Sequence, residues 1–384
     1  VAGCNLGQVT AFKPIRIHRT DDRFPVRGVQ QESRLAAQRA LCFVQPVSGP
    51  SYGLQALVSD SGIAWRFVIP GKGVRRINGE TACWRLPPES RIWFAERRSD
   101  WKLKTYAGEW LCTSLTNLYA VSPQGPIQTM PLVAELPAGH GYAAIVEAAL
   151  FRYSGMRLSA EPDGTLRGCF TEASGFEVDG PIQTPWRVLL LAPTLNAWVN
   201  NDLIAQLAPP PDPELFDSEA WITGGRSVWS WWQGRDDYMQ PEAEKQMIDA
   251  AAALNFEFTT IDEGWEKWTN AWSVLTELCD YARARSVRVF VWKHSREIRQ
   301  PESDYSALRE FLDQVKQAGA AGVKIDFMNS ESYDTILFDE RVLIEAARRR
   351  LLVNFHGCQK PSGEARTYPN EVTREGIRGL ELNR

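Results

Sequence analysis

The chain has 384 residues, 44% of them hydrophobic and 23% charged, with a formal net charge of −4. This is the composition of a globular protein, which argues against disorder, and the interspersed acids and bases provide no basic field for nucleic acid or a membrane surface. No apolar run approaches the roughly 20 residues that span a bilayer. The seven cysteines occur singly, without a CxxC pair, and so do not indicate a zinc site.

Short apolar or alternating runs separated by turn residues fill the chain to about residue 207. The clearest are GIAWRFVIP, SRIWFAER, YAAIVEAAL and WRVLLLAP, which predict β-strands. Four prolines between Pro209 and Pro213 then exclude a helix or a central strand. These patterns predict an all-β domain over residues 1–207 and a proline-rich linker over residues 208–220.

Predicted strands alternate with predicted helices after the linker. The strands cover residues 226–232, 256–262, 287–292, 322–327, 351–356 and 376–382, and the helices cover residues 242–254, 273–285, 304–318 and 334–350. Repeated strand–helix units indicate a parallel sheet, and six of them favour a (β/α)8 barrel over an open sheet. No glycine-rich nucleotide motif follows any strand.

We therefore predict a barrel over residues 221–384 that is truncated after about six of its eight strands. The chain begins at Val1 and ends directly after an apolar segment, so we expect it to be a fragment. No signal peptide is recognisable in it, and the pattern leaves the oligomeric state open.

Residues that carry chemistry gather at the predicted strand ends, where barrels form their active sites. They are Trp231, Trp232, Asp262, Glu263, Trp265, Trp292, His294, Asp326, His356 and Glu381. Two carboxylates between aromatic walls are what cleavage of a glycosidic bond requires, one as acid and one as nucleophile or base. Lys324 shares the strand face of Asp326 and would keep that carboxylate ionised.

Each of these residues also has a structural interpretation. Asp262 and Glu263 either bind substrate hydroxyls or cap a helix, and Trp265 either stacks on a sugar or shapes the pocket. His356 either contacts a sugar hydroxyl or is a satisfied structural residue. Glu375 and Glu381 offer hard oxygen ligands that suit calcium, or form surface salt bridges with neighbouring arginines.

Three segments together strongly resemble glycoside hydrolase family 97, the calcium-dependent bacterial α-glycosidases. They are VNFHGCQKPSGEARTYPNEVTREGIRGLELN, GVKIDFMNSE and TIDEGWEKW. Upstream, WFAERRSDWKLKTYAGEW and VEAALFRYSGM resemble the N-terminal β-sandwich of that family, and the likeness covers roughly residues 60–384. The resemblance implies an incomplete N-terminal β-sandwich over residues 1–207 and a catalytic barrel, incomplete at its end, over residues 221–384.

The resemblance also implies a catalytic arrangement. Inverting members carry a glutamate base after the histidine of the fifth strand, where this chain has Gly357. Retaining members instead carry a nucleophilic aspartate that matches Asp326, and the general acid/base of the family matches Glu381. Its calcium ligands match Glu147, Glu375 and Glu381.

The implied activity is that of a retaining, exo-acting α-glycosidase on oligosaccharides or glycosides, first of all an α-galactosidase. Lys324, His356, Asp262, Glu263 and Trp265 would bind substrate, and Lys360 and Arg366 would either orient the glutamates or be solvated. An α-glucosidase of the same family and a non-catalytic carbohydrate-binding remnant are the alternatives. The resemblance further implies a periplasmic or secreted location in a bacterium.

Overall fold

A computed structural model describes residues 1–27, 30–96, 108–122, 125–234 and 239–380. The chain divides into two compact units. The N-terminal unit comprises Val1–Pro210 with two later segments, Ser330–Leu337 and Lys360–Arg366. The C-terminal unit comprises Pro211–Asn329, Phe338–Gln359 and Thr367–Arg384.

The N-terminal unit contains a large antiparallel sheet and a smaller one. The large sheet has the order β1 (Val9–Pro25), β2 (Glu32–Pro46), β3 (Tyr52–Ser59), β4 (Gly62–Ile69), β16 (Trp186–Ala192), β11 (Tyr142–Ala148), β10 (Leu132–Glu135), β7 (Arg91–Glu96) and β8 (Glu109–Ser114), with β15 (Ile182–Gln183) pairing with β4. The smaller sheet has the order β6 (Cys83–Trp84), β13 (Leu166–Phe170), β12 (Met156–Ala160) and β9 (Ile127–Gln128).

The two sheets bury one common apolar cluster, as the alternation of their strands requires. Ile92 and Phe94 of β7 and Ile145 of β11 contribute from the large sheet, and Met156 and Leu158 of β12 contribute from the smaller one. This unit also contains β5 (Val74–Ile77), β14 (Phe176–Asp179), α1 (Leu118–Val121), α2 (Leu195–Val199), α3 (Leu203–Leu207) and the short 3-10 helices η2 (Leu115–Asn117) and η3 (Pro137–Gly139).

The C-terminal unit is built on a parallel sheet of six strands in consecutive order. They are β17 (Ser227–Trp229), β18 (Phe258–Ile261), β19 (Arg288–His294), β20 (Gly322–Asp326), β21 (Leu352–Phe355) and β22 (Glu371–Arg374). The helices are α4 (Trp231–Gly234), α5 (Pro241–Ala253), α6 (Ala271–Arg283), α7 (Ser295–Ile298), α8 (Ser306–Ala318) and, from residue 338 on, α9 (Tyr333–Arg348). The short helix α10 (Glu364–Thr367) belongs to the N-terminal unit except for its last residue. The alternation of strands and helices is that of a partial barrel.

Two predicted strands need correction. The sixth strand is β22 and not residues 376–382, of which residues 376–380 lie outside any strand and the rest outside the described residues. The first strand ends at Trp229, because Trp231 and Trp232 begin the short helix α4. The other predicted strands and the four long helices agree with the structure to within a few residues.

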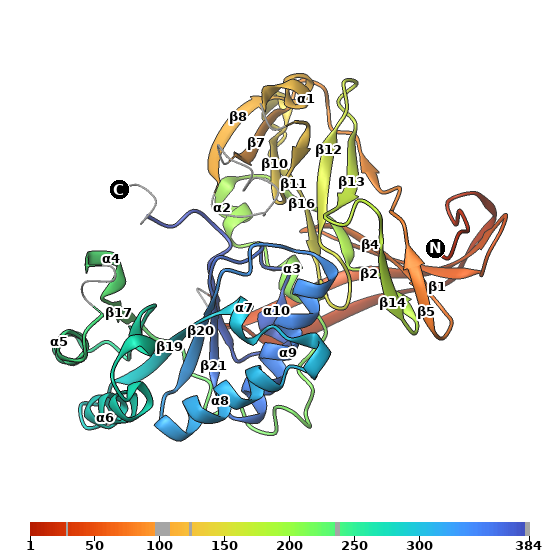
Figure 1. Cartoon of the computed structure of the whole chain (residues 1–384). Helices are drawn as coiled ribbons and strands as arrows, with labels where there is room; N and C mark the ends of the chain where they lie inside the picture. The colour runs from red at the N-terminus through yellow and green to blue at the C-terminus, as the bar shows by residue number, and fades with distance from the viewer. Residues whose placement is uncertain (28–29, 97–107, 123–124, 235–238, 381–384) are drawn as a thin grey trace. The chain divides into compact units, whose positions relative to one another are not determined.

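The parallel sheet has two different faces. Ile261, Val291, Ile325 and Phe355 point to one face and pack against α5, α6, α8 and α9 in the largest apolar cluster (Figure 1). On the other face Phe258, Phe290 and Leu352 form an apolar layer at the strand starts, covered by Phe216 and Ile222. Because side chains alternate along a strand, every second residue after this apolar layer points to the same face. The polar residues among them therefore lie at the carboxyl ends of the strands.

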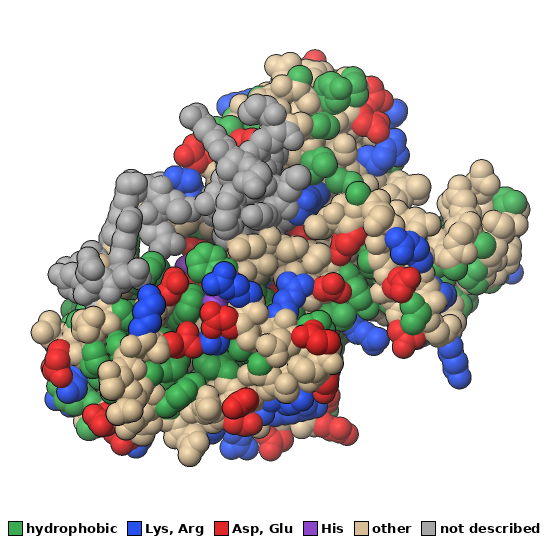
Figure 2. All heavy atoms as spheres, viewed as in Figure 1, with side chains coloured by type: hydrophobic (Ala, Val, Ile, Leu, Met, Phe, Trp, Pro, Cys, Tyr) green, Lys and Arg blue, Asp and Glu red, His purple; other side chains and the backbone are tan. Residues whose placement is uncertain are grey.

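The surface agrees with the balanced composition. Figure 2 shows acidic and basic side chains interspersed over the visible face. No helix in the described parts of the chain is long and apolar enough to cross a membrane.

Candidate active site

Asp326 is the last residue of β20 and lies at the centre of the polar cluster at the strand ends. Its Oδ1 accepts a hydrogen bond from the backbone N–H of Phe327 at 2.6 Å. Its Oδ2 accepts one from Trp292 Nε1 at 3.0 Å and lies 3.3 Å from His356 Nδ1 and 3.6 Å from Lys324 Nζ. Both oxygens of this buried carboxylate are therefore occupied by donors.

The donors set the charge of Asp326. Burial raises its pKa, but the hydrogen bond from His356, the charge of Lys324 and the hydrogen bond from Trp292 outweigh burial and lower the pKa to about 2. The carboxylate is ionised at neutral pH, which a nucleophile requires.

Lys324 connects Asp326 to a second carboxylate. Its Nζ donates to Asp262 Oδ2 at 2.6 Å, and both side chains are buried. The same Asp262 oxygen accepts a hydrogen bond from the indole N–H of Trp229, and the Lys324 ammonium lies 4.3 Å from the centre of a Trp229 ring. One buried cation is thus shared by two aspartates at the ends of β18 and β20, the strands on either side of β19.

His356, directly after β21, lies between two carboxylates. Its Nδ1 is 3.3 Å from Asp326 Oδ2 and 3.2 Å from Glu375 Oε2, and the backbone N–H of Gly357 donates to that Glu375 oxygen at 3.0 Å. The ring edge of His356 also meets Trp229, with centroids 5.9 Å apart. These contacts place Asp326, His356 and Glu375 in one group.

The backbone turns sharply immediately after Asp326. Phe327 has a φ of +60°, a conformation that a bulky side chain rarely adopts, and Asn329 has a φ of +53°. The turn is held by Ser295, whose hydroxyl donates to the Phe327 carbonyl, and by the Phe327 ring, which stacks on His294 at 4.9 Å. Local strain of this kind is concentrated at functional sites.

The other predicted site residues differ in how deeply they are buried. Trp265 is 1% exposed, packs in the main core and donates to the Trp292 carbonyl at 3.0 Å, which favours the pocket-shaping alternative over sugar stacking. Glu263 is partly buried, and its N–H donates to Asp262 Oδ1 at 2.7 Å. Burial lowers the pKa of His294. Glu381 lies outside the described residues.

Glu147, a predicted calcium ligand, lies on β11 inside a network of buried charges in the N-terminal unit. Its Oε1 is 2.7 Å from Lys360 Nζ and its Oε2 is 2.6 Å from Arg187 Nη1. Arg187 also pairs with Glu80, and Lys360 also pairs with Glu331. These oxygens are already bound by cations, and Lys360 is buried, not solvated.

Metal binding stays a prediction. No group of three His, Cys, Asp or Glu side chains arranged to hold a metal ion occurs within the described ranges. The oxygens of Glu375 have the chemistry that calcium prefers, but the described donors do not complete a calcium site.

Two tryptophans in the site have a hydrogen-bonding role that the sequence did not specify: Trp292 was predicted only as one of the aromatic residues at the strand ends, and Trp229 was not singled out. Trp292 donates to Asp326 and Trp229 donates to Asp262, so both indoles act as hydrogen-bond donors to carboxylates. Their common signal is their place at the ends of two parallel strands, because tryptophan N–H groups that are buried need an acceptor. Trp229 was not chosen as a candidate because the strand was predicted to continue to Trp232, which made Trp231 and Trp232 the tryptophans at its end.

Buried Glu244 of α5 is a further titratable group near the site. Ser230, which follows Trp229, donates to Glu244 Oε1 at 2.7 Å. Burial raises the pKa of Glu244 to about 7; Asp262 raises it further, and the hydrogen bond from Ser230 opposes the rise. The carboxyl group is therefore partly protonated near neutral pH.

Taken together, the strand ends hold an ionised aspartate with fixed donors, a neighbouring histidine and a second aspartate neutralised by a lysine. Such a group can attack an electrophilic carbon or stabilise positive charge that develops on one. Covalent or electrostatic catalysis at a sugar's anomeric carbon is chemistry of this type.

Comparisons with known proteins identify the family of this chain. The family model of glycoside hydrolase 97 matches residues 221–377, and the model of its N-terminal domain matches residues 9–210. A probable retaining alpha-galactosidase of Streptomyces bingchenggensis is 33% identical over 354 residues, which cover 87% of this chain and 51% of that protein. A retaining alpha-galactosidase of Bacteroides thetaiotaomicron is 27% identical over 368 residues, covering 84% and 53%.

Solved structures show the same fold. A beta-arabinopyranosidase superimposes with a TM-score of 0.85 at 22% identity, covering 97% of this chain and 63% of that one. A glycoside hydrolase family 97 enzyme from Pseudoalteromonas sp. strain K8, in complex with acarbose, has a TM-score of 0.82 at 19% identity, covering 97% and 62%. The chain spans about half the length of the curated relatives it matches. The chain belongs to glycoside hydrolase family 97.

Proposed function

We propose that the protein is a retaining α-glycosidase that acts on terminal α-galactosides. The observation that carries the proposal is Asp326, a buried carboxylate at a strand end that Lys324, His356 and Trp292 keep ionised. The position after His356, where inverting members of the family carry their base, is Gly357. Two relatives named retaining alpha-galactosidase support the same choice of mechanism and sugar.

The reaction then has two steps. In the first, an Asp326 oxygen attacks the anomeric carbon, the bond from that carbon to the leaving oxygen breaks, and the leaving oxygen takes a proton from the general acid, for which Glu381 is the candidate. In the second, water attacks the same carbon and gives its proton to Glu381. The ester bond breaks and Asp326 is restored.

The remaining residues have supporting roles in this proposal. Lys324 keeps Asp326 ionised and balances the negative charge of Asp262. Asp262 in turn accepts hydrogen bonds from sugar hydroxyls. His356, 3.2 Å from Glu375, fixes the orientation of both neighbouring carboxylates. Glu147, Glu375 and Glu381 as calcium ligands stay a prediction, and no step is assigned to a metal. A periplasmic or secreted location likewise stays a prediction.

Proton NMR during hydrolysis of an aryl α-galactoside tests the proposal, because it shows which anomer of the free sugar forms first. Appearance of α-galactose first is expected for a retaining enzyme with Asp326 as nucleophile. Appearance of the β anomer first would show direct attack by water and exclude that role for Asp326. Parallel assays with aryl α-glucoside and aryl β-arabinopyranoside determine the sugar, and faster hydrolysis of either would replace α-galactoside as the substrate.

A further inference from the structure

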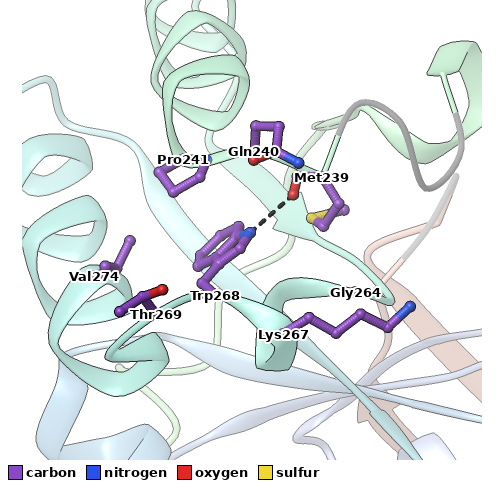
Figure 3. Close-up of a pocket in the computed structure, with 8 residues that line it drawn as sticks. All are labelled: Met239, Gln240, Pro241, Gly264, Lys267, Trp268, Thr269 and Val274. Carbon is purple, nitrogen blue, oxygen red and sulfur yellow. Dashed lines mark hydrogen bonds between the residues drawn. The ribbon is translucent and has the colours of Figure 1, made fainter.

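A pocket of about 430 Å³ opens between two of the loops that follow strands of the parallel sheet (Figure 3). Met239, Gln240 and Pro241 line it from the start of α5, and Gly264, Lys267, Trp268 and Thr269 line it from the loop after β18, with Val274 of α6. The volume lies in the range of small-molecule sites. Both loops follow the carboxyl ends of strands, the face on which barrel enzymes bind their substrates.

The indole of Trp268 is held rigidly at this pocket. Its Nε1 donates to the Met239 carbonyl at 2.8 Å, and its ring meets the buried Trp265 edge-on, with centroids 6.5 Å apart. Trp268 nevertheless remains partly exposed and lies among the lining residues in Figure 3. An aromatic surface that is already fixed loses little entropy when a ligand binds.

The loop backbone is shaped to form the pocket. Gly264 has a φ of +107°, which only glycine adopts without strain, and a Cβ atom there would lie 3.1 Å from Met239 Cγ. The following turn, η5 (Trp265–Lys267), is closed by the N–H of Trp268, which donates to the Trp265 carbonyl at 3.1 Å. This geometry directs Trp268 toward Met239.

The lining has the mixed chemistry that suits a sugar ring. Trp268, Pro241, Met239 and Val274 are apolar, whereas Gln240, Lys267 and Thr269 are exposed polar side chains able to donate or accept hydrogen bonds. A pyranose likewise combines C–H groups that pack on aromatic rings with hydroxyl groups around its edge.

We propose that this pocket binds a pyranose unit of an oligosaccharide substrate other than the sugar that is cleaved. The inference rests on the proposed function. The same loop carries Asp262, two residues before Gly264, and Trp265 supports Trp292, the indole that donates to Asp326. A second sugar held by Trp268 would thus extend recognition from the cleaved sugar toward the rest of the chain.

The test compares a short substrate with a longer one. For the Trp268→Ala variant, the ratio of kcat/KM for raffinose to kcat/KM for an aryl α-galactoside is expected to fall about tenfold, the usual effect of removing an aromatic anchor. Trp268→Phe keeps the aromatic face and should restore most of the ratio. Trp110→Ala, which removes an exposed tryptophan of β8, is the matched control and should leave the ratio unchanged.

An unchanged ratio in Trp268→Ala, or equal losses on both substrates, would overturn the pocket assignment, because equal losses mean that Trp268 only supports the fold. If Trp268→Ala does not fold, Lys267→Met combined with Thr269→Val changes the polar rim and carries the same expectation. If the protein hydrolyses neither compound, the proposed function fails. Titration with raffinose then decides the pocket alone, with weaker binding by the variant supporting it and equal binding excluding it.

Discussion

Two buried groups of charges in this protein are organised in opposite ways. In the N-terminal unit, Glu80, Glu147 and Glu331 are matched by Arg157, Arg187 and Lys360, and all six are nearly inaccessible. At the strand ends of the C-terminal unit, Lys324 alone is within contact of both Asp262 and Asp326 in the described part of the chain. The first group is neutral and closed, whereas the second combines several carboxylates with one lysine.

The difference indicates what each group does. A closed, charge-balanced network joins distant parts of the chain: Lys360 and Glu331 belong to the two later segments of the N-terminal unit, and Glu147 and Arg187 belong to its large sheet. A group with more carboxylates than cations can attack, or stabilise, a carbon that becomes positively charged. Stability is therefore expected to respond to the first group and activity to the second.

Asp326→Asn is the change with the largest expected effect on this comparison. Asparagine keeps the shape and can still accept from Trp292, but it cannot act as a nucleophile, so kcat should fall about 10³-fold or more while the fold persists. Hydrolysis of an aryl α-galactoside and thermal unfolding measure the two quantities. Asp249→Asn, on the exposed face of α5, is the control and should retain activity. Substantial turnover by Asp326→Asn would remove Asp326 from the catalytic role.

Lys360→Met is expected to destabilise the protein by about 3–5 kcal/mol, because Glu147 and Glu331 would lose a buried cation that contacts both. Denaturant unfolding of the N-terminal unit measures the loss. Lys316→Met, at an exposed position of α8, should change the unfolding free energy by less than about 0.5 kcal/mol. Equal stability of the two variants would contradict a structural role for the network.

Glu244 extends the comparison to a buried carboxyl group that accepts a hydrogen bond from the neutral hydroxyl of Ser230. Its pKa in the folded protein, about 7, is above the unfolded value of 4.5, so the folded state holds the proton more tightly and stability declines as pH rises from about 4.5 to about 7. The loss is on the order of 3 kcal/mol. Glu244→Gln should largely remove this decline between pH 5 and pH 8 in urea unfolding. A decline that persists in the variant would assign it to another group.

Local patterns in the sequence were enough to predict most of the barrel-like sheet. Strand–helix alternation placed β18 to β21 within a few residues, and period-two alternation placed Lys324 and Asp326 on one face. The strand β22 was missed because Glu371–Arg374 has no apolar alternation and pairs with β21 only through tertiary context. The apolar run after it was more conspicuous but forms no strand among its described residues.

The buried network could not be predicted in the same way. Glu147 and Lys360 are 213 positions apart, and neither has a local pattern that specifies its partner. The resemblance suggested a metal ligand for Glu147 and an orienting or solvated role for Lys360. The structure pairs the two residues with each other and buries Lys360, which contradicts only the solvated alternative. Similarly, the hydrogen bonds of Trp229 and Trp292 depend on which strand follows which in the sheet.

Of the changes that alter activity, Lys324→Met is expected to have the smaller effect, because it keeps Asp326 and changes only the pH at which that carboxylate ionises. The pKa of Asp326, about 2, lies below its ordinary value of 3.8, so its ionised form stabilises the fold above pH 3.8 and this contribution is lost as pH falls toward 2. Without Lys324, burial is opposed by fewer contacts, and the acidic limb of kcat/KM should move up by about one pH unit. Lys293→Met is the control, since Lys293 pairs with Glu266 and Glu297 and not with Asp326. A shift of the acidic limb in both variants would mean that the combined charge of the groups around the strand ends, and not the contact with Lys324, keeps Asp326 ionised.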